Sequence, residues 1–279
     1  MAATQIATNL AFINWTLLTG LALGSYASVI LLRRRTSATS GYLGFTTACA
    51  IGFGLLAWLS DGALPATLGT SPVVLDATWD GPRHSALVAF CVLAVIALVA
   101  RRMRPTAGTV IEWAAVVAGA ATLIFGALAW GGGPMGTVSL LTQLGVVTAA
   151  IGGVFAAMIL GHWYLVTPKL PEAPLILLAR VLTAVIALQL VLFWAWVATG
   201  AGPADVGPFA ALGGQWALYV WLRLIVGLVF PLIVSWAAIK TARTRSMESA
   251  TGLLYINVGT IAAGTILAAG LYFGAGLLV

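Results

Sequence analysis

Charged side chains are scarce in this sequence. Asp, Glu, Lys and Arg make up 7% of its 279 residues, whereas a soluble domain carries about 25%. Hydrophobic residues account for 61% of the chain, and the mean hydropathy is +1.07. A soluble core of this size does not need so much apolar surface. The composition therefore indicates a multi-pass membrane protein whose first partner is the lipid bilayer.

Cysteine and histidine are also rare, with two of each. Cys49 and Cys91 lie inside apolar runs, and no CxxC or CxxCH pattern occurs, so we expect no zinc ribbon and no covalently bound haem. His84 and His162 fall near opposite ends of their spans, more than ~20 Å apart across the hydrocarbon. A bis-histidine haem within this chain is therefore not expected, and without an intramembrane carboxylate cluster neither is a metal site.

Signals for cleavage, nucleotide binding and hydrolysis are missing as well. The N-terminus, "MAATQIATNL", has no basic n-region, so we interpret the first apolar run as a retained span. No Walker A, GxSxG, HExxH or GxGxxG context appears, and the sequence assigns no catalytic residue. The pI is 9.8, but the basic residues lie in short loops. This pattern is typical of membrane topology and does not indicate nucleic acid.

What the sequence does contain is a series of long apolar runs. Eight of them reach the ~20 residues that cross a bilayer, and a chain in lipid must satisfy its backbone polar groups within each segment. We therefore predict an all-α fold, with residues 1–279 forming a single integral membrane domain. The predicted spans are 10–32, 42–63, 84–101, 109–130, 138–165, 174–199, 215–239 and 249–277.

Lys and Arg gather in alternate loops. Ten of them lie in the loops 33–41, 101–108, 165–173 and 240–248, and only Arg83 lies in the opposite loops. By the positive-inside rule, the four basic loops are predicted to be cytoplasmic and both termini outside. We expect the chain in the cytoplasmic membrane of a bacterium.

A weak internal similarity suggests two halves, 1–135 and 136–279. "GSYASVILLR" (24–33) resembles "GVFAAMILGH" (153–162), and "TLIFGALAWG" (122–131) resembles "TILAAGLYFG" (265–274). Two four-helix bundles related by an axis along the membrane normal would produce this order. Glycines four residues apart in the first and last spans predict close helix packing there.

Polar residues inside or beside spans are the default pointers to function. One group falls at the basic end of the spans, where a quinone ring would find hydrogen-bond donors and proton carriers. We expect His162 to face the protein, and Arg180 to pair with Glu112 or Glu248. The quinone-binding candidates are His162, Tyr164, Arg180 and Tyr255, and the proton-relay candidates are Glu112 and Glu248.

A second polar group falls at the other end of the spans. Asp61, His84 and Arg223 are its main members, accompanied by Asp80 and two tryptophans. The alternative for both groups is structural, because Trp and Tyr form interfacial belts and Arg extends toward the headgroups.

The first span, "NWTLLTGLALGSYASVILL", together with eight spans and external termini, resembles the NrfD-like membrane subunits. These include the anchors of polysulfide and dimethyl-sulfoxide reductases. In that family the second span leads into a His/Asp-Leu-Gly-x-Pro stretch, and "LSDGALPATLG" offers Asp61 and Pro65 in a similar place. The resemblance implies a quinone-binding subunit that anchors other subunits of a respiratory complex. It assigns no residue role.

Three classes of function therefore stay open, and enzymatic activity is undecided. The first is an electron-transfer subunit that binds quinone non-covalently. The second is a transporter or channel for a small solute or ion, for which Pro231 and Gly227 offer a helix break. The third is a non-catalytic scaffold or assembly subunit that docks partners on the loops 64–83 and 200–214.

Overall fold

The computed structural model describes residues 2–167 and 169–279. Within them the fold is entirely helical, and eight helical segments are long and apolar enough to cross a membrane. The predicted all-α class and the eight spans are confirmed. The spans are α2 (Leu10–Arg35), α3 (Ser40–Asp61), α4 (Asp80–Met103), α5 (Pro105–Trp130), α6 (Pro134–Val166), α7 (Ala173–Thr199), the continuous α8 (Ala217–Leu224), η4 (Ile225–Val229) and α9 (Phe230–Arg243), and α10 (Met247–Ala275).

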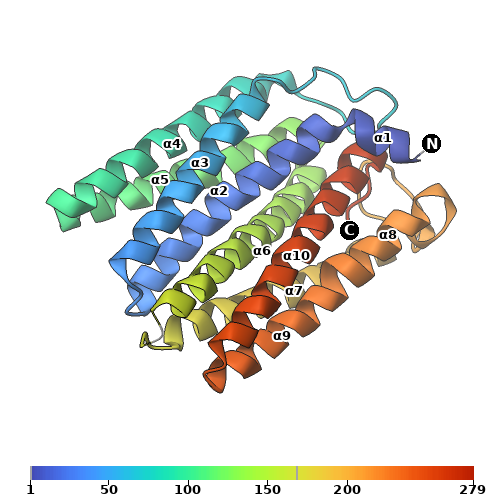
Figure 1. The fold of residues 1–279 in the computed structure, drawn as a ribbon. Coiled ribbons are helices and arrows are strands. Elements are labelled where there is room, and N and C mark those ends of the chain that lie inside the picture. Colours follow the sequence, from blue (N-terminus) through green and yellow to red (C-terminus); the bar gives the residue numbers. More distant parts are fainter. Residues whose placement is uncertain (1, 168) are drawn as a thin grey trace.

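Both chain ends lie at the same end of the bundle (Figure 1). We call this the termini end; it also carries the long connections 62–76 and 200–213. The opposite, basic end carries the tight turns 36–39 and 244–246 and the described part of 167–172. Short helices complete the termini end: α1 (Ala2–Thr8), η1 (Ala77–Trp79), η2 (Ala210–Leu212) and η3 (Gly214–Trp216).

Two helices form the centre of the molecule. The first and fifth spans, α2 and α6, pack along each other and are the most completely buried. The helices α3, α4 and α5 cover one side of this pair, and α7, α8–α9 and α10 cover the other (Figure 1). The arrangement agrees with two four-helix bundles that meet at corresponding helices, while the internal repeat itself stays a prediction.

The central contact depends on glycine. A Cβ atom on Gly24 would lie 2.0 Å from the Thr148 carbonyl oxygen and 2.9 Å from the Gly152 Cα atom. Backbone therefore meets backbone where α2 crosses α6, as small residues allow in membrane helices. This confirms the close packing that Gly20 and Gly24 predicted.

The seventh span is not a regular α-helix. Its central segment, η4 (Ile225–Val229), is a π-helix that precedes Pro231. Proline has no N–H to donate to the preceding turn, and π segments accommodate such interruptions. At this level Gly227 lies against Gly264 of α10, where a Cβ on either residue would be 2.7 Å from the other Cα atom.

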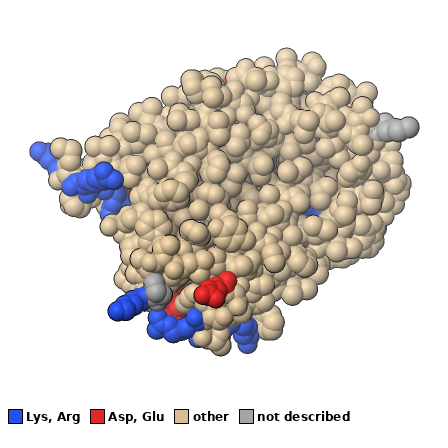
Figure 2. All heavy atoms as spheres, viewed as in Figure 1, with Lys and Arg blue, Asp and Glu red and all other residues tan. Residues whose placement is uncertain are grey.

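Charge is concentrated at the basic end. Figure 2 shows Lys and Arg side chains gathered there, while the lateral surface in this view is almost uncharged. The chain is thus a multi-pass integral membrane protein whose polar chemistry must lie at its two ends or in its interior.

Candidate functional site

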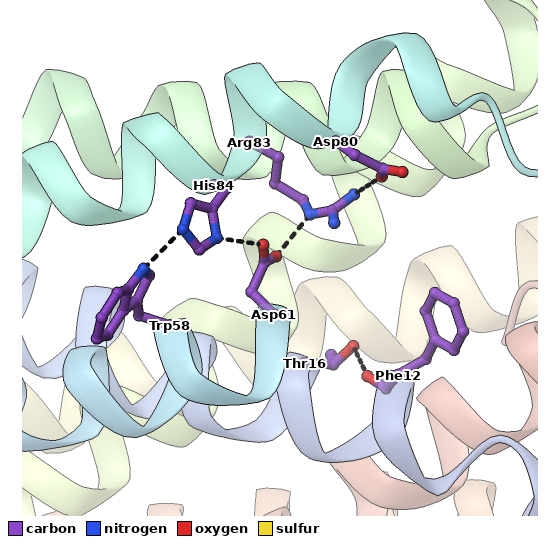
Figure 3. Close-up of polar contacts among 7 residues, drawn as sticks. All are labelled: Phe12, Thr16, Trp58, Asp61, Asp80, Arg83 and His84. Carbon is purple, nitrogen blue, oxygen red and sulfur yellow. Dashed lines mark hydrogen bonds and ion pairs between the residues drawn. The ribbon is translucent and has the colours of Figure 1, made fainter. Parts of the chain in front are cut away.

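A buried ion pair joins α3 to α4 at the termini end (Figure 3). Arg83 Nε donates to Asp61 Oδ1 at 2.7 Å, and the two residues are 2% and 6% exposed. His84 Nδ1 lies 3.0 Å from the second oxygen, Asp61 Oδ2. Both oxygens of one carboxylate are therefore engaged, as a buried charge requires.

The tautomer of His84 follows from its second partner. Trp58 Nε1 lies 2.8 Å from His84 Nε2. An indole N–H can only donate, so Nε2 must accept and the neutral ring carries its proton on Nδ1. His84 thus donates to Asp61 and orients that carboxylate. Hydrogen-bond partners behind the ligands of metal sites orient those ligands in the same way.

Arg83 is held from three further sides. Its Nη1 donates to Asp80 Oδ1 at 2.6 Å, and its guanidinium carbon lies 4.8 Å from the ring centroid of Trp130 and 5.9 Å from that of Trp15. Cation–π contacts of this kind stabilise a cation that has lost water. The described residues leave Nη2 of Arg83 without a hydrogen-bond partner, so this nitrogen remains a free donor.

The chain of polar groups borders a cavity of about 480 Å³. Asp61, Asp80, Arg83 and His84 line one side of it. Phe12 and Trp130 supply apolar wall, and Gly62, Leu64, Pro65 and Ala66 of the connection after α3 also line it. Its volume falls in the usual range for small-molecule sites, and such sites combine apolar walls with a few polar groups.

The local sequence explains why these groups meet. Asp80, Arg83 and His84 are spaced i, i+3 and i+4 at the start of α4, so they share one helix face. Asp61 is the last residue of α3, the antiparallel neighbour. We predicted that the span begins at residue 84, which left Arg83 in a loop; that boundary is wrong, since α4 begins at Asp80. The spacing D-x-x-R-H was the available signal.

The predicted quinone-binding group at the basic end is only partly assembled. Tyr255 Oη lies 3.4 Å from His162 Nδ1, but both residues are exposed on the side of the bundle. The expectation that His162 faces the protein is wrong. Leu160, Gly161 and Tyr164 form the buried stripe of α6, and His162 is turned about 100° from Gly161. Tyr164 instead donates to the Pro171 carbonyl and ties the helix end to the turn.

Arg180 does not make the expected pairs. It is exposed on α7, and no ion pair among the described residues joins it to Glu112 or Glu248. Glu112, which is 3% exposed, pairs with Arg33 and with Arg101, whose Nη1 lies 3.2 Å from Glu112 Oε2. The reason is position: Glu112 faces α2 and α4 within the first half, while Arg180 belongs to the second. Glu248 is exposed at the start of α10.

Arg223 is separate from Asp61 and His84. It is 3% exposed and donates from Nη2 to Gln189 Oε1 at 2.6 Å, and from Nη1 to the Gly227 carbonyl at 3.4 Å. Gln189 in turn donates to the Val146 carbonyl at 3.1 Å. The described residues place no carboxylate side chain against this guanidinium. The predicted group of Asp61, His84 and Arg223 is thus two sites in different halves.

Within the described residues, no group of three His, Cys, Asp or Glu side chains is placed to hold a metal ion. Comparison of the chain with known protein families, curated proteins and solved structures finds no match.

Proposed function

We propose that the chain is the membrane subunit of an electron-transfer complex and binds a quinone or quinol in the cavity at the termini end. The observation that carries the proposal is the Asp61 carboxylate, buried between Arg83 and His84 at the wall of that cavity. Oxidation of a quinol needs a base such as a carboxylate to take its protons, a hydrogen-bond donor for its oxygen atoms and an apolar wall for its ring.

Each residue has a defined role in this proposal. Oxidation of the quinol releases two protons and two electrons. Asp61 accepts the proton of one hydroxyl and Asp80 that of the other, whose oxygen also accepts a hydrogen bond from the free Nη2 donor of Arg83. Asp80, whose side chain is 54% exposed, passes protons toward the termini end. His84 and Trp58 orient Asp61, and do not themselves take the proton. The electrons pass to a redox centre of a partner subunit.

The residues expected at the basic end support this function less well. His162 and Tyr255 are exposed on the side of the bundle, and Glu112 is neutralised by two arginines. For that reason the proposed site lies at the opposite end from the one first expected.

Two matched pairs of variants test the proposal. The purified protein in lipid nanodiscs is titrated anaerobically with a water-soluble short-chain quinol, and the dissociation constant is measured. Asp61→Asn removes the carboxylate that accepts from the quinol hydroxyl, and His84→Gln removes the imidazole that orients it. Both should weaken binding about tenfold or more, the effect of losing one hydrogen bond to a charged group. His162→Gln and Asp76→Asn remove the same groups outside the cavity and should bind normally.

The alternatives give different results. A transporter is favoured by the π segment η4 and the buried Arg223 in the seventh span. It predicts solute flux in proteoliposomes that Arg223→Gln abolishes, with no quinol binding. A scaffold predicts neither activity. If His162→Gln alone weakens quinol binding, the site lies at the basic end and the present assignment is wrong.

A further inference from the structure

A second hollow, at the basic end of the first half, has an excess of positive charge. It measures about 360 Å³ and lies between the turn 36–39 and the end of α4. Its walls contain three arginines, two leucines and the N-terminal residues of two helices. The lining residues are Arg33, Ala38, Ser40, Leu43, Gly44, Leu98, Arg101, Arg102 and Pro105.

The charges around this hollow do not balance. Arg33 and Arg101 share a single carboxylate, with Arg33 on Glu112 Oε1 and Arg101 on Oε2. Arg102 lines the same hollow and forms no ion pair among the described residues. Three guanidinium groups against one carboxylate leave a net charge of 3 − 1 = +2. Like charges held this close repel each other, so a bound anion would stabilise them.

The shape of the hollow adds an apolar component. Leu43 and Leu98 line it from α3 and α4. Gly44 faces open space, since a Cβ atom added there would meet none of the described residues within 4 Å. Within the part of the chain that the structure describes, the side chain of Thr39 makes no capping hydrogen bond to the first turn of α3. The N–H groups of that turn are therefore available to an anion.

We propose that this hollow binds the phosphodiester headgroup of an anionic phospholipid. The phosphate oxygens lie among Arg33, Arg101 and Arg102, to which guanidinium groups donate in pairs. An acyl chain follows the apolar groove past Gly44 between α3 and α4. The hollow lies where the spans end, at the depth of lipid headgroups, and basic pockets between helices at that depth suit anionic lipids. The inference is independent of quinone binding.

The test is a lipid titration followed by native mass spectrometry of the detergent-purified protein. Phosphatidylglycerol and phosphatidylcholine with identical acyl chains are compared. We expect phosphatidylglycerol to bind about tenfold more tightly. Equal binding of the two lipids would overturn the proposal. So would inorganic phosphate, added alone at constant ionic strength, if it bound as tightly as the lipid.

Three variants locate the site. Arg102→Gln should reduce phosphatidylglycerol binding roughly tenfold, whereas Arg104→Gln removes the same charge two residues away, outside the hollow, and should not. Gly44→Leu keeps every charge and fills the groove, so it should also reduce binding. Equal losses in Arg102→Gln and Arg104→Gln would mean that only the general charge of this end attracts lipid, which contradicts a site. Normal binding by Gly44→Leu would contradict the groove.

Discussion

Breaking the ion pair between Arg83 and Asp61 should cost more stability when Arg83 is replaced than when Asp61 is replaced. Arg83→Met leaves the Asp61 carboxylate buried beside a neutral imidazole, and removing one partner of a buried pair costs about 3–5 kcal/mol. Asp61→Asn leaves Arg83 with Asp80 and two tryptophan rings, which are better compensation. We therefore expect Arg83→Met to be the more destabilising change, as measured by thermal unfolding in detergent.

The double variant Asp61→Asn/Arg83→Met checks the explanation. It removes both charges, so its loss of stability should be smaller than that of Arg83→Met alone. A double variant as unstable as the sum of the two single variants would show that the charges do not interact.

Arg223 provides a second prediction, because its strongest partner is a neutral amide. Gln189→Leu removes the Oε1 acceptor 2.6 Å from Arg223 Nη2. Loss of a hydrogen bond to a charged group costs about 1.5–3 kcal/mol. The free energy of unfolding should therefore fall by that amount.

The control for this change is Gln143→Leu. Gln143 is equally buried. Among the described residues, its Oε1 has no partner and its Nε2 donates only to the Ala268 carbonyl, at 3.3 Å. This variant should cost clearly less than Gln189→Leu. A similar loss in both would mean that side-chain volume, and not the bond to Arg223, determines the effect.

At the scale of elements, the contact of α2 with α6 is the most restrictive. Gly24→Ala would place a methyl group on the Thr148 carbonyl oxygen, so the two central helices must separate. We expect a loss of several kcal/mol, as for overpacking of a rigid contact. Gly52→Ala is the matched control on α3, because a Cβ atom there meets nothing within 4 Å. It should be neutral or slightly stabilising in the same unfolding measurement.

The segment that leads into α4 contains a carboxyl group, that of Asp76, which makes the stability of the fold depend on pH. Asp76 immediately precedes η1. Hydrogen bonds from Thr78, first from its side chain and then from its backbone N–H, lower the pKa of this exposed carboxyl below its ordinary 3.8. A group whose pKa is lower in the folded state stabilises the fold above its unfolded pKa. That contribution is lost as pH falls through the folded value. Asp76→Asn should thus reduce the difference in melting temperature between neutral and strongly acidic solution.

The sequence predicted the number and approximate place of the spans better than the residues at which each helix begins and ends. Long apolar runs identify each span, because the bilayer sets a minimum length that few other structures need. The ends depend on local contacts instead: α4 begins at Asp80 because η1 and Asp76 lead the chain into it. The π segment η4 had only Pro231 as a signal, and hydrophobicity does not distinguish π from α geometry.

The sequence also predicted part of the candidate site, because the long apolar runs show which residues lie near the end of a span. Asp61 and His84 were recognised as polar residues at one end of their spans, and depth follows from position along the chain. Arg83 was missed with the helix boundary. The separation of Arg223 from His84 depends on which helices are neighbours and how each is rotated, and composition fixes neither. The exposure of His162, by contrast, could have been read from the stripe of Leu160, Gly161 and Tyr164.

At the scale of the whole molecule, the two ends differ in charge and in cavities. The basic end has short turns and an excess of arginine, and the termini end has long connections over a cavity with two carboxylates. Protons taken by Asp61 and Asp80 would therefore leave at the termini end. The direction of proton release across the membrane depends on which side that end faces.

The orientation is tested by labelling with a membrane-impermeant maleimide in intact cells. Cys49 and Cys91 are first replaced by alanine, and single cysteines are introduced as Thr70→Cys at the termini end and Ser37→Cys in the turn 36–39. Both positions are exposed. Ten Lys and Arg residues lie in the last helical turns and the connections of the basic end, whereas Arg83, in the first turn of α4, is their counterpart at the termini end. The positive-inside rule therefore predicts a cytoplasmic basic end. Thr70→Cys should react in intact cells, and Ser37→Cys only after the membrane is permeabilised. The reverse pattern would place the Asp61 cavity on the cytoplasmic side, and quinol oxidation there would release its protons inward.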